Sequence, residues 1–451
     1  MSNDNVNITN VDIQYEANSM SPVPYEERSL TPIGLSMVYW SSLIAVQIIT
    51  IGLFLMYPNG PLNIVQLGVA AVISGIIFSV IMALAGEPGA KYGIPFMVQI
   101  RSAFGLKGAK LVGILRSIPA IIWNGIATWY GAEAMSVVTN TIFGWGNPFV
   151  YFAILLIIET VLCATGFETV AWFDKFMSIV IYILLAYFFI NLLAKGSLDF
   201  SAALEYEGSW GAPFIFACLT GISHMSACLM NGADLARNVK WTPGKERSEN
   251  IKFLVFGALP PWLVMFAFGI IINVQTGLTD PITGLSMIAP NALFAVLLMV
   301  FLCLAQVTTN LSLNHLVGSL VFKDLFNWKW KNCAIVVGIL SCITCPWYLA
   351  SSSGFNWIMN IASMFLGPLV AIMLADYFVV RHSKMNMKAL YDGSYTYTNG
   401  WNVPSMISFV AGWICAIIFA NYAWFVGFAV AFISYLVMKL GMHLDADKDF
   451  L

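Results

Sequence analysis

The stretch LGVAAVISGIIFSVIMALA, residues 67–85, contains no charged side chain and no proline. As a helix with a rise of 1.5 Å per residue, such a run is long enough to cross a hydrocarbon core of about 30 Å. Comparable apolar segments recur along the whole chain, centred near residues 45, 72, 122, 157, 182, 222, 263, 303, 342, 367, 411 and 433. The sequence therefore predicts an all-α integral membrane protein with twelve transmembrane helices.

The composition supports this fold class and excludes several functions. Of the 451 residues, 59% are hydrophobic and only 10% are charged, against about 25% charged in soluble proteins. Lys and Arg stand singly between apolar segments and form no basic stripe, which argues against nucleic acid as a partner. We expect the partners to be a small-molecule substrate and the lipid bilayer, and we expect a monomer.

The basic residues also predict an orientation. All of the 21 Lys and Arg residues except Lys195 fall on one predicted side, so the positive-inside rule places both termini in the cytoplasm. Residues 1–31 are polar and lack the pattern of a signal peptide, and we expect a disordered cytoplasmic tail there, with a second cytoplasmic tail at residues 444–451. The expected location is the inner membrane of a bacterium.

The cysteines do not predict a disulfide framework. Most of the eight cysteines lie within apolar segments, where a free Cys behaves as a small hydrophobe. Cys342 and Cys345 have the spacing of a redox or metal pair, but no His or second pair lies nearby, so we interpret both as structural.

Three segments have polar or irregular centres, which a bilayer tolerates only beside a cavity or protein interior. They are the first, with Ser41 and Ser42, the sixth, over residues 220–226, and the eighth, over residues 306–314. The first and sixth segments are five apart, which indicates two inverted five-helix repeats with broken first helices. The predicted units are the repeats at 32–195 and 196–380, followed by a connecting loop and two peripheral helices at 381–443.

Thr308 and Thr309 lie side by side near the middle of the eighth segment, one turn after Ala305. Hydroxyl and carbonyl oxygens can hold Na⁺ without a full buried negative charge. The alternative is that each hydroxyl simply bonds the carbonyl one turn earlier, as Ser and Thr in membrane helices commonly do.

Trp123 and Asn314 suit a flat heteroaromatic ligand. The indole face of Trp123, beside the amide of Asn124, can stack on a ring, and the amide of Asn314 can bond the edge of an imide or urea. The alternative for Trp123 is ordinary packing.

Glu133, Glu159 and His224 are the ionisable residues deepest in the predicted spans, where such groups are costly. Each is either part of a proton pathway or a neutral group bonded to a neighbouring helix. The sequence shows no phosphate-binding glycine loop, metal-binding cluster or nucleophile elbow, so we expect no enzyme activity and no cofactor.

Several motifs together resemble the nucleobase:cation symporter-1 family, which includes purine, pyrimidine, allantoin and hydantoin permeases. The matching residues occur in family order over roughly residues 24–400 and are Pro24–Ser29, Gly89–Phe96, Arg101–Gly105, Trp123–Gly125, Asp234–Arg237, Thr308–Asn310 with Asn314, Leu366–Leu369, Asp376–Phe378 and Arg381.

The resemblance implies a leucine-transporter-like fold of two inverted five-helix repeats plus two peripheral helices. It also implies a sodium site formed by the Thr308 and Thr309 hydroxyls with the carbonyl oxygens of Ser41, Ile44 and Ala305. In the same family pattern, Trp123 stacks on the substrate ring and Asn314 bonds its edge.

The chain departs from the family's hydantoin transporter at two substrate positions. Ala127 replaces a glutamine, and Met225 stands where a second stacking aromatic is expected. Asn124, Gln306 or Ser223 can supply the lost hydrogen bond, and the sequence does not choose among them.

These observations predict a secondary transporter that imports a small planar nitrogenous compound by cation symport, with Na⁺ as the expected coupling ion. H⁺ symport through Glu133, Glu159 or His224 is the main alternative. A channel or a receptor is a more remote one.

Overall fold

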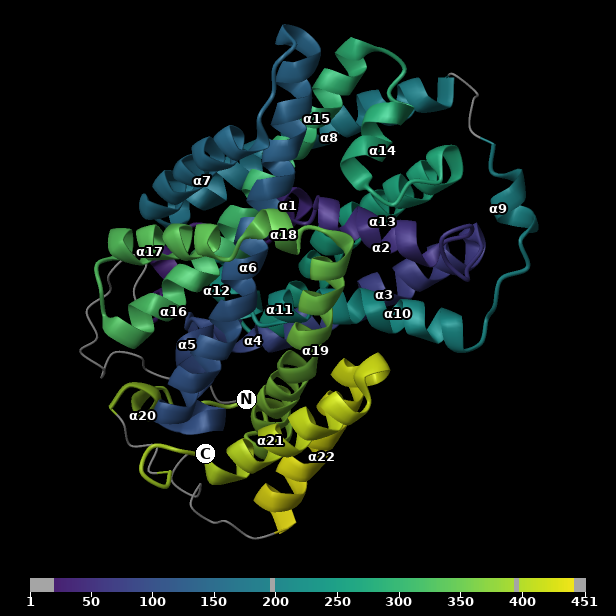
Figure 1. Cartoon of the computed structure of the whole chain (residues 1–451). Helices are drawn as coiled ribbons and strands as arrows, with labels where there is room; N and C mark the ends of the chain where they lie inside the picture. Colours follow the sequence, from purple (N-terminus) through teal and green to yellow (C-terminus); the bar gives the residue numbers. More distant parts are fainter. Residues whose placement is uncertain (1–19, 195–198, 393–396, 442–451) are drawn as a thin grey trace.

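The computed structural model describes residues 20–194, 199–392 and 397–441 (Figure 1). Across these residues the regular structure is helical, and the only β-type contacts are isolated bridges. The expectation of an all-α protein is confirmed.

Each predicted segment coincides with a helix, except that the first centre, Ala45, falls at a break between two helices. Long apolar helices are α3 (Ile64–Ala85), α6 (Arg101–Phe143), α8 (Phe167–Ala194), α13 (Glu246–Thr276), the run of α15 (Ala292–Thr309), η3 (Asn310–His315) and α16 (Leu316–Phe326), and α22 (Ala423–Gly441). A further candidate span is the bent pair α1 (Pro32–Ser42) and α2 (Val46–Leu55). Shorter apolar helices are α7 (Pro148–Ala164), α10 (Ala212–His224), α17 (Trp330–Ile343), α19 (Ser352–Leu374) continuing into η4 (Ala375–Val380), and α21 (Val403–Ile418).

Short helices fill the connections. They are η2 (Tyr25–Glu27), α4 (Glu87–Tyr92), α5 (Phe96–Gln99), α9 (Ser201–Glu205), α11 (Ser226–Leu229), α12 (Gly232–Ala236), α14 (Pro281–Ile288), α18 (Pro346–Leu349), α20 (Met387–Asp392) and η5 (Ala420–Tyr422).

The long helices pack in two main groups. The first group contains α1, α2, α3, α10 and α13, and the second contains α6, α7, α15, α16 and α17. Helix α21 packs on α22 and both pack on α19, forming a separate layer at the lower end of the view in Figure 1. Within the groups, α3 packs on α13, α6 on α15 and α7 on α17, so predicted segments five positions apart are neighbours, as two inverted repeats require.

Small residues bring α2 and α13 into close contact. A Cβ atom on Gly52 would lie 3.2 Å from the Cα of Gly269, and one on Gly269 would lie 2.6 Å from the carbonyl oxygen of Ile49. Close approach through glycine is a common way for helices to associate inside a membrane. Here it fixes α2, the second half of the broken first segment, against the seventh predicted segment.

The disorder expected over residues 1–31 is wrong for the last part of that tail, whereas residues 1–19 lie outside the described residues. Arg28 is 6% exposed, and its Nη1 donates to the carbonyl oxygens of Ala90 at 2.7 Å and Val239 at 3.2 Å. Leu30 is buried and pairs with Val239. The Arg28 guanidinium holds the segment in place by donating to two backbone carbonyls, one on α4 and one shortly after α12.

Candidate functional site

The first predicted segment is broken at its centre. The Ser41 and Ser42 hydroxyls both donate back to the carbonyl oxygen of Val38, at 3.0 and 2.7 Å. Ala45 then takes an extended conformation, α2 starts at Val46, and the axes of α1 and α2 differ by 62°. The break exposes backbone oxygens in the interior of the fold, which a continuous helix would keep for itself.

Two hydroxyls of α15 reach this break. The Thr308 hydroxyl lies 3.1 Å from the Ser41 carbonyl oxygen, and the Thr309 hydroxyl lies 3.4 Å from that of Ile44. Both hydroxyls also lie 2.9 Å from the carbonyl oxygen of Ala305. The structure therefore brings together all five predicted oxygens, and each hydroxyl makes the local helix contact as well as the contact across to α1.

These five oxygens fit a small monovalent cation. The two hydroxyls are side-chain donors to the three carbonyl oxygens, and the Ser41 carbonyl also accepts a hydrogen bond from the Ile44 backbone N–H at 3.3 Å. No carboxylate belongs to it, and within the described ranges no cluster of three or more His, Cys, Asp or Glu side chains could hold a metal ion. Hard neutral oxygens at the end of a broken helix are the ligands that transporters use for Na⁺.

A cavity of about 430 Å³ opens directly beside the break. It is enclosed by the broken parts of the first and sixth predicted segments, by α6 and by α15 with η3. Its lining residues are Ser42, Leu43, Ala45, Gln47, Ile48, Trp123, His224, Met225, Ala227, Cys228, Thr309, Leu313 and Asn314.

Three predicted substrate residues lie on this cavity. Trp123 comes from α6, Met225 from the break after α10, and Asn314 from η3. The Trp123 ring meets the His224 ring edge to face, with ring centres 5.5 Å apart. An indole, a thioether and an amide therefore converge with Thr309 on one space, which suits a flat ligand with polar edges.

Four other predicted substrate residues do not line the cavity, namely Asn124, Ala127, Ser223 and Gln306. Asn124 is fully buried and its Nδ2 donates to the Ser341 hydroxyl at 3.1 Å, because it faces α17 instead. Ala127 and Gln306 are also fully buried. The Ser223 backbone carbonyl accepts a hydrogen bond from the Ser226 hydroxyl at 2.6 Å.

Glu159 lies in a buried polar cluster outside the cavity. The Thr128 hydroxyl lies 2.7 Å from its Oε2, and the Nδ2 of Asn310 lies 3.1 and 3.2 Å from its two carboxyl oxygens. Asn310 in turn accepts a hydrogen bond from the Nδ2 of Asn314 at 3.0 Å. A chain of hydrogen bonds thus joins the cavity wall to Glu159.

The other ionisable candidates have different surroundings. Glu133 is half-buried and accepts a hydrogen bond from the Trp129 indole at 2.8 Å. His224 is on the cavity itself, against Trp123. Glu133 and Glu159 therefore lie in separate hydrogen-bond groups, and His224 belongs to the cavity wall.

Two polar residues near the site escaped the sequence reasoning. Gln47 follows the break and lines the cavity, and Asp174 on α8 is fully buried and accepts a hydrogen bond from the Ser312 hydroxyl of η3. The available signal was their isolation, because each is a polar side chain within a mostly apolar segment.

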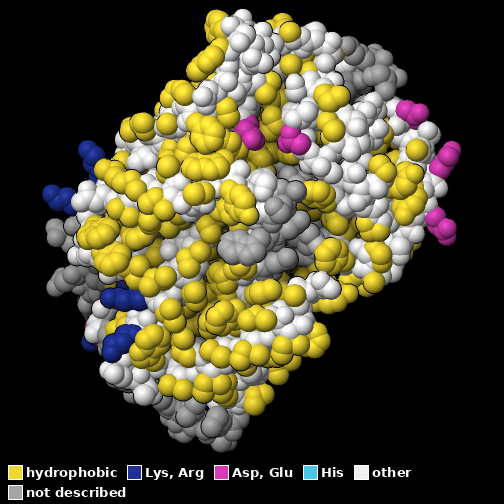
Figure 2. Space-filling model, viewed as in Figure 1, with side chains coloured by type: hydrophobic (Ala, Val, Ile, Leu, Met, Phe, Trp, Pro, Cys, Tyr) yellow, Lys and Arg dark blue, Asp and Glu magenta, His cyan; other side chains and the backbone are white. Residues whose placement is uncertain are grey.

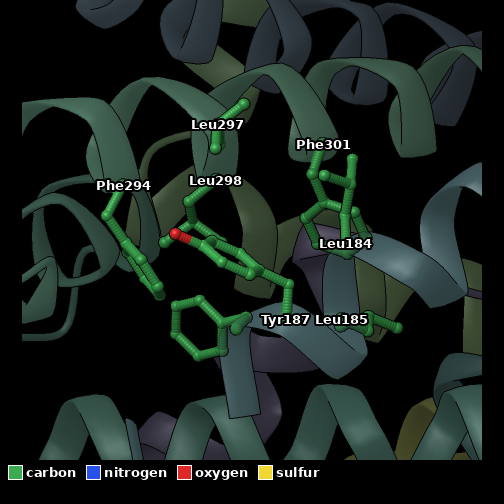
Figure 3. A pocket seen from close by; sticks show the side chains of 8 residues that line it. Leu184, Leu185, Tyr187, Phe294, Leu297, Leu298 and Phe301 are labelled. Carbon is green, nitrogen blue, oxygen red and sulfur yellow. The ribbon is translucent and has the colours of Figure 1, made fainter. Parts of the chain in front are cut away.

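A second pocket, of about 260 Å³, lies between α8 and α15 and differs in character (Figure 3). Its lining consists of leucine and phenylalanine side chains with Tyr187, whose hydroxyl is the only polar side-chain atom there. One hydroxyl is the only side-chain group in this lining that could bond the edge of a nitrogenous ring, so the more polar cavity beside the break is the candidate substrate site.

Comparison with known proteins now adds to this geometry. The family model described as "Permease for cytosine/purines, uracil, thiamine, allantoin" matches residues 22–441. The chain belongs to this family, the nucleobase:cation symporter-1 permeases. The family resemblance inferred from the motifs is confirmed.

Individual relatives agree with the family assignment. The hydantoin permease of Microbacterium maritypicum is 26% identical over 95% of this chain and 88% of its own. The allantoin permease of Bacillus subtilis is 27% identical over 79% of this chain and 80% of its own. The relatives are permeases, so the chain is a membrane transporter and not an enzyme.

Solved structures show the same fold. The transporter Mhp1 in a closed conformation with bromovinylhydantoin bound superposes with a TM-score of 0.85 at 22% identity, covering 96% of each chain. A Na⁺-coupled sialic acid symporter gives a TM-score of 0.61 at 14% identity, covering 92% of this chain and 90% of its own. The expected secondary-transporter fold is therefore confirmed.

Proposed function

We propose that this permease imports a small planar nitrogenous compound by symport with Na⁺. The observation that carries the proposal is the meeting of five neutral oxygens from α1 and α15 beside a cavity lined by Trp123 and Asn314. In this assignment Na⁺ binds the Thr308 and Thr309 hydroxyls and the Ser41, Ile44 and Ala305 carbonyl oxygens.

The substrate class follows from the chemistry of the cavity wall and from the relatives. Hydantoin, allantoin, purines and uracil, named for the relatives, are compact and carry N–H and C=O groups on their edges. The indole of Trp123 offers a stacking face and the amide of Asn314 offers an edge contact. Met225 can pack on the opposite side of a ring.

The proposed ion site and the substrate cavity share a residue, and this can couple the binding of ion and substrate. Thr309 belongs both to the oxygen cluster and to the cavity lining. An ion that stabilises the broken end of α1 in one position therefore favours the same cavity shape that binds substrate. By linkage, the substrate raises the affinity for the ion by the same factor.

H⁺ symport is the second candidate, and the buried Glu159 favours it. The donors to this carboxyl from the described residues, the Thr128 hydroxyl and the Asn310 amide, are neutral, so it can carry a proton inside the membrane. Glu133 and His224 are alternative proton carriers.

We propose that all twelve predicted segments cross the membrane, with both termini in the cytoplasm of a bacterial cell and with the protein acting as a monomer. Figure 2 shows Lys and Arg side chains gathered at the left of the view and Asp and Glu side chains at the top and right, a separation that supports this orientation. The repeat boundaries 32–195 and 196–380 belong to the same proposal.

The test is uptake by purified protein in liposomes with an imposed Na⁺ gradient. Radiolabelled hydantoin, allantoin, uracil and a purine are the probes. We expect accumulation of at least one probe that depends on Na⁺. Thr309→Ala should remove most of the Na⁺ dependence, and Trp123→Ala should weaken substrate affinity roughly tenfold, the scale of one lost aromatic contact.

Matched controls exist for both variants. The Thr160 hydroxyl also bonds the carbonyl oxygen one turn earlier, at 2.7 Å, but lies on α7 away from the α1 break, so Thr160→Ala should keep full Na⁺ dependence. Trp172 is 62% exposed on α8, so Trp172→Ala should keep substrate affinity. Uptake that ignores Na⁺, follows a pH gradient and is lost in Glu159→Leu would overturn sodium coupling in favour of H⁺.

A further inference from the structure

The amides of Asn314 and Asn310 form a chain of hydrogen bonds from the cavity to Glu159. The atoms around Asn310 determine which end of each amide donates. Asn314 lines the cavity and donates from its Nδ2 to the Oδ1 of Asn310 at 3.0 Å. Asn310 donates from its own Nδ2 toward Glu159, which is fully buried. The two amides therefore lie head to tail.

Four acceptor atoms fix the amide of Asn310. Its Nδ2 lies 3.0 Å from the Asn124 carbonyl oxygen, 2.9 Å from the Thr128 hydroxyl oxygen, and within 3.2 Å of both Glu159 carboxyl oxygens. The Asn124 carbonyl can only accept. If the amide were rotated by half a turn, its oxygen would face a carbonyl oxygen and a carboxyl group, so the rotated state is disfavoured.

This direction holds for either protonation state of Glu159. An ionised carboxylate accepts from both Thr128 and Asn310. A protonated carboxyl donates to the Thr128 oxygen, Thr128 then donates to the Asn124 carbonyl at 2.8 Å, and Asn310 still donates to the free carboxyl oxygen. In both cases the Oδ1 of Asn310 faces Asn314.

The consequence appears at the cavity wall. One N–H of the Asn314 amide is engaged with Asn310, which fixes the rotation of the amide, and no hydrogen bond reaches its Oδ1 from the described residues, so this oxygen is an acceptor left for a ligand. We propose that Asn310 and Glu159 are positioning residues that hold the Asn314 amide with its carbonyl oxygen available to the substrate, so that the site favours a substrate with an N–H donor at that edge. This proposal rests on the proposed function, since it specifies how the same cavity selects its substrate.

The first experiment measures binding to the purified protein by Trp fluorescence or calorimetry. The probes are hydantoin, uracil and allantoin, each with its N-methylated isomers. Methylating the ring nitrogen that faces Asn314 should weaken binding to the wild type by about tenfold or more, because the Asn314 oxygen then has no donor. The other isomers should lose less.

The Asn310→Leu variant should reduce this discrimination. Without Asn310, the Asn314 amide is free to turn and offer its NH₂ group, so the ratio between parent and methylated compound should fall to about threefold or less. Ser341→Ala is the matched control, because it removes a buried hydrogen bond from Asn124 without touching the amide pair, and its ratio should equal that of the wild type. An unchanged ratio in Asn310→Leu would overturn the proposal.

A second experiment needs no ligand. Asn310→Asp places acceptor oxygens against the Asn124 carbonyl and Glu159, so the Tm in detergent should fall by more than in Ser341→Ala. Glu159→Gln alone should change the Tm little. Combined with Asn310→Asp, it supplies an amide donor to the new carboxyl and should recover part of the loss.

The two experiments separate two kinds of failure. If Asn310→Asp is as stable as Ser341→Ala, the amide direction is reversed and the inference fails, whatever the substrate is. If the stability pattern holds while none of the probes binds the wild type, the direction of Asn314 is supported and the substrate class of the proposed function is overturned.

Discussion

Glu159 and Asp234 are both buried carboxyls, but the chain surrounds them differently. Asp234 on α12 lies 2.5 Å from the Arg116 guanidinium of α6, and both side chains are 1% exposed. Asp234 also accepts a hydrogen bond from the Phe96 backbone at 2.9 Å. From the described part of the chain, Glu159 contacts only the Thr128 hydroxyl and the Asn310 amide.

The difference shows how one membrane protein uses carboxyls in two ways. Where a cation faces the carboxyl, the pair is electrostatic, and it ties α6 in one helix group to α12 beside the other. The Arg116 guanidinium also lies 4.1 Å from the centre of the Phe96 ring, which stabilises its charge away from water. Where only neutral donors face the carboxyl, its main effect is to orient the amides next to it.

Replacing each carboxyl by the amide of the same size should give the largest difference in the free energy of unfolding. Asp234→Asn leaves the buried Arg116 without a counter-charge, which should lower the free energy of unfolding by about 3–5 kcal/mol. Glu159→Gln keeps an acceptor for Asn310 and places an NH₂ group beside Thr128, so its cost should stay below about 1 kcal/mol. Unfolding in mixed micelles, followed by circular dichroism, measures both.

A double variant sharpens this contrast. Arg116→Met combined with Asp234→Asn removes both charges, so it should be more stable than either single variant. Equal losses for Asp234→Asn and Glu159→Gln would show that the two carboxyls are not held differently after all.

The neutral cluster should respond to loss of its hydroxyl by a smaller amount. Thr128 is fully buried and contacts the Asn124 carbonyl oxygen, the Asn310 amide and Glu159. Thr128→Val keeps the shape but removes these bonds, so we expect a loss of about 1–3 kcal/mol in the same unfolding measurement.

Thr160→Val provides the control for that variant. The Thr160 hydroxyl donates to the Leu156 carbonyl of its own helix, and that carbonyl keeps its helical partner. The expected loss is below about 1 kcal/mol. If both variants lost the same amount, the Thr128 hydroxyl would have no special place in the cluster.

Much of the fold could be predicted because apolar runs of membrane length are a strong and repeated signal. The break at Ser41–Ala45 was also readable, since two serines in mid-span indicate an irregular backbone. The prediction of a disordered tail failed for residues 20–31. Their composition is polar, but their order depends on contacts with the carbonyls of Ala90 and Val239, which lie far away in the sequence.

The sequence predicted the site residues that belong to family motifs. It did not predict which way individual side chains point. Thr308 and Thr309 meet the α1 carbonyls as expected. Asn124 was expected near the substrate but faces Ser341, because its position on α6 turns it toward α17. The π-helical turn at Asn310–His315 changes the helical phase, which a sequence pattern with a 3.6-residue period does not reveal.

The smallest effect should come from an ion pair that joins a half-exposed arginine to a carboxylate whose side chain is 5% exposed. Arg247 contacts Glu87 at 2.5 Å, but its side chain is 49% exposed, and Glu87 also accepts a hydrogen bond from the Tyr377 hydroxyl at 3.0 Å. Since solvent screens such pairs, Arg247→Ala should cost about 0.2–1 kcal/mol.

Salt separates this pair from the buried one. Raising the ionic strength from about 0.01 M to 1 M shortens the screening length from about 30 Å to about 3 Å, so most of the Arg247→Ala loss should vanish. The Asp234→Asn loss should persist, because Arg116 and Asp234 are shielded from solvent ions. If salt reduced both losses equally, the Arg116–Asp234 pair would be open to water. Burial of charge would then not explain why Asp234 and Glu159 respond differently.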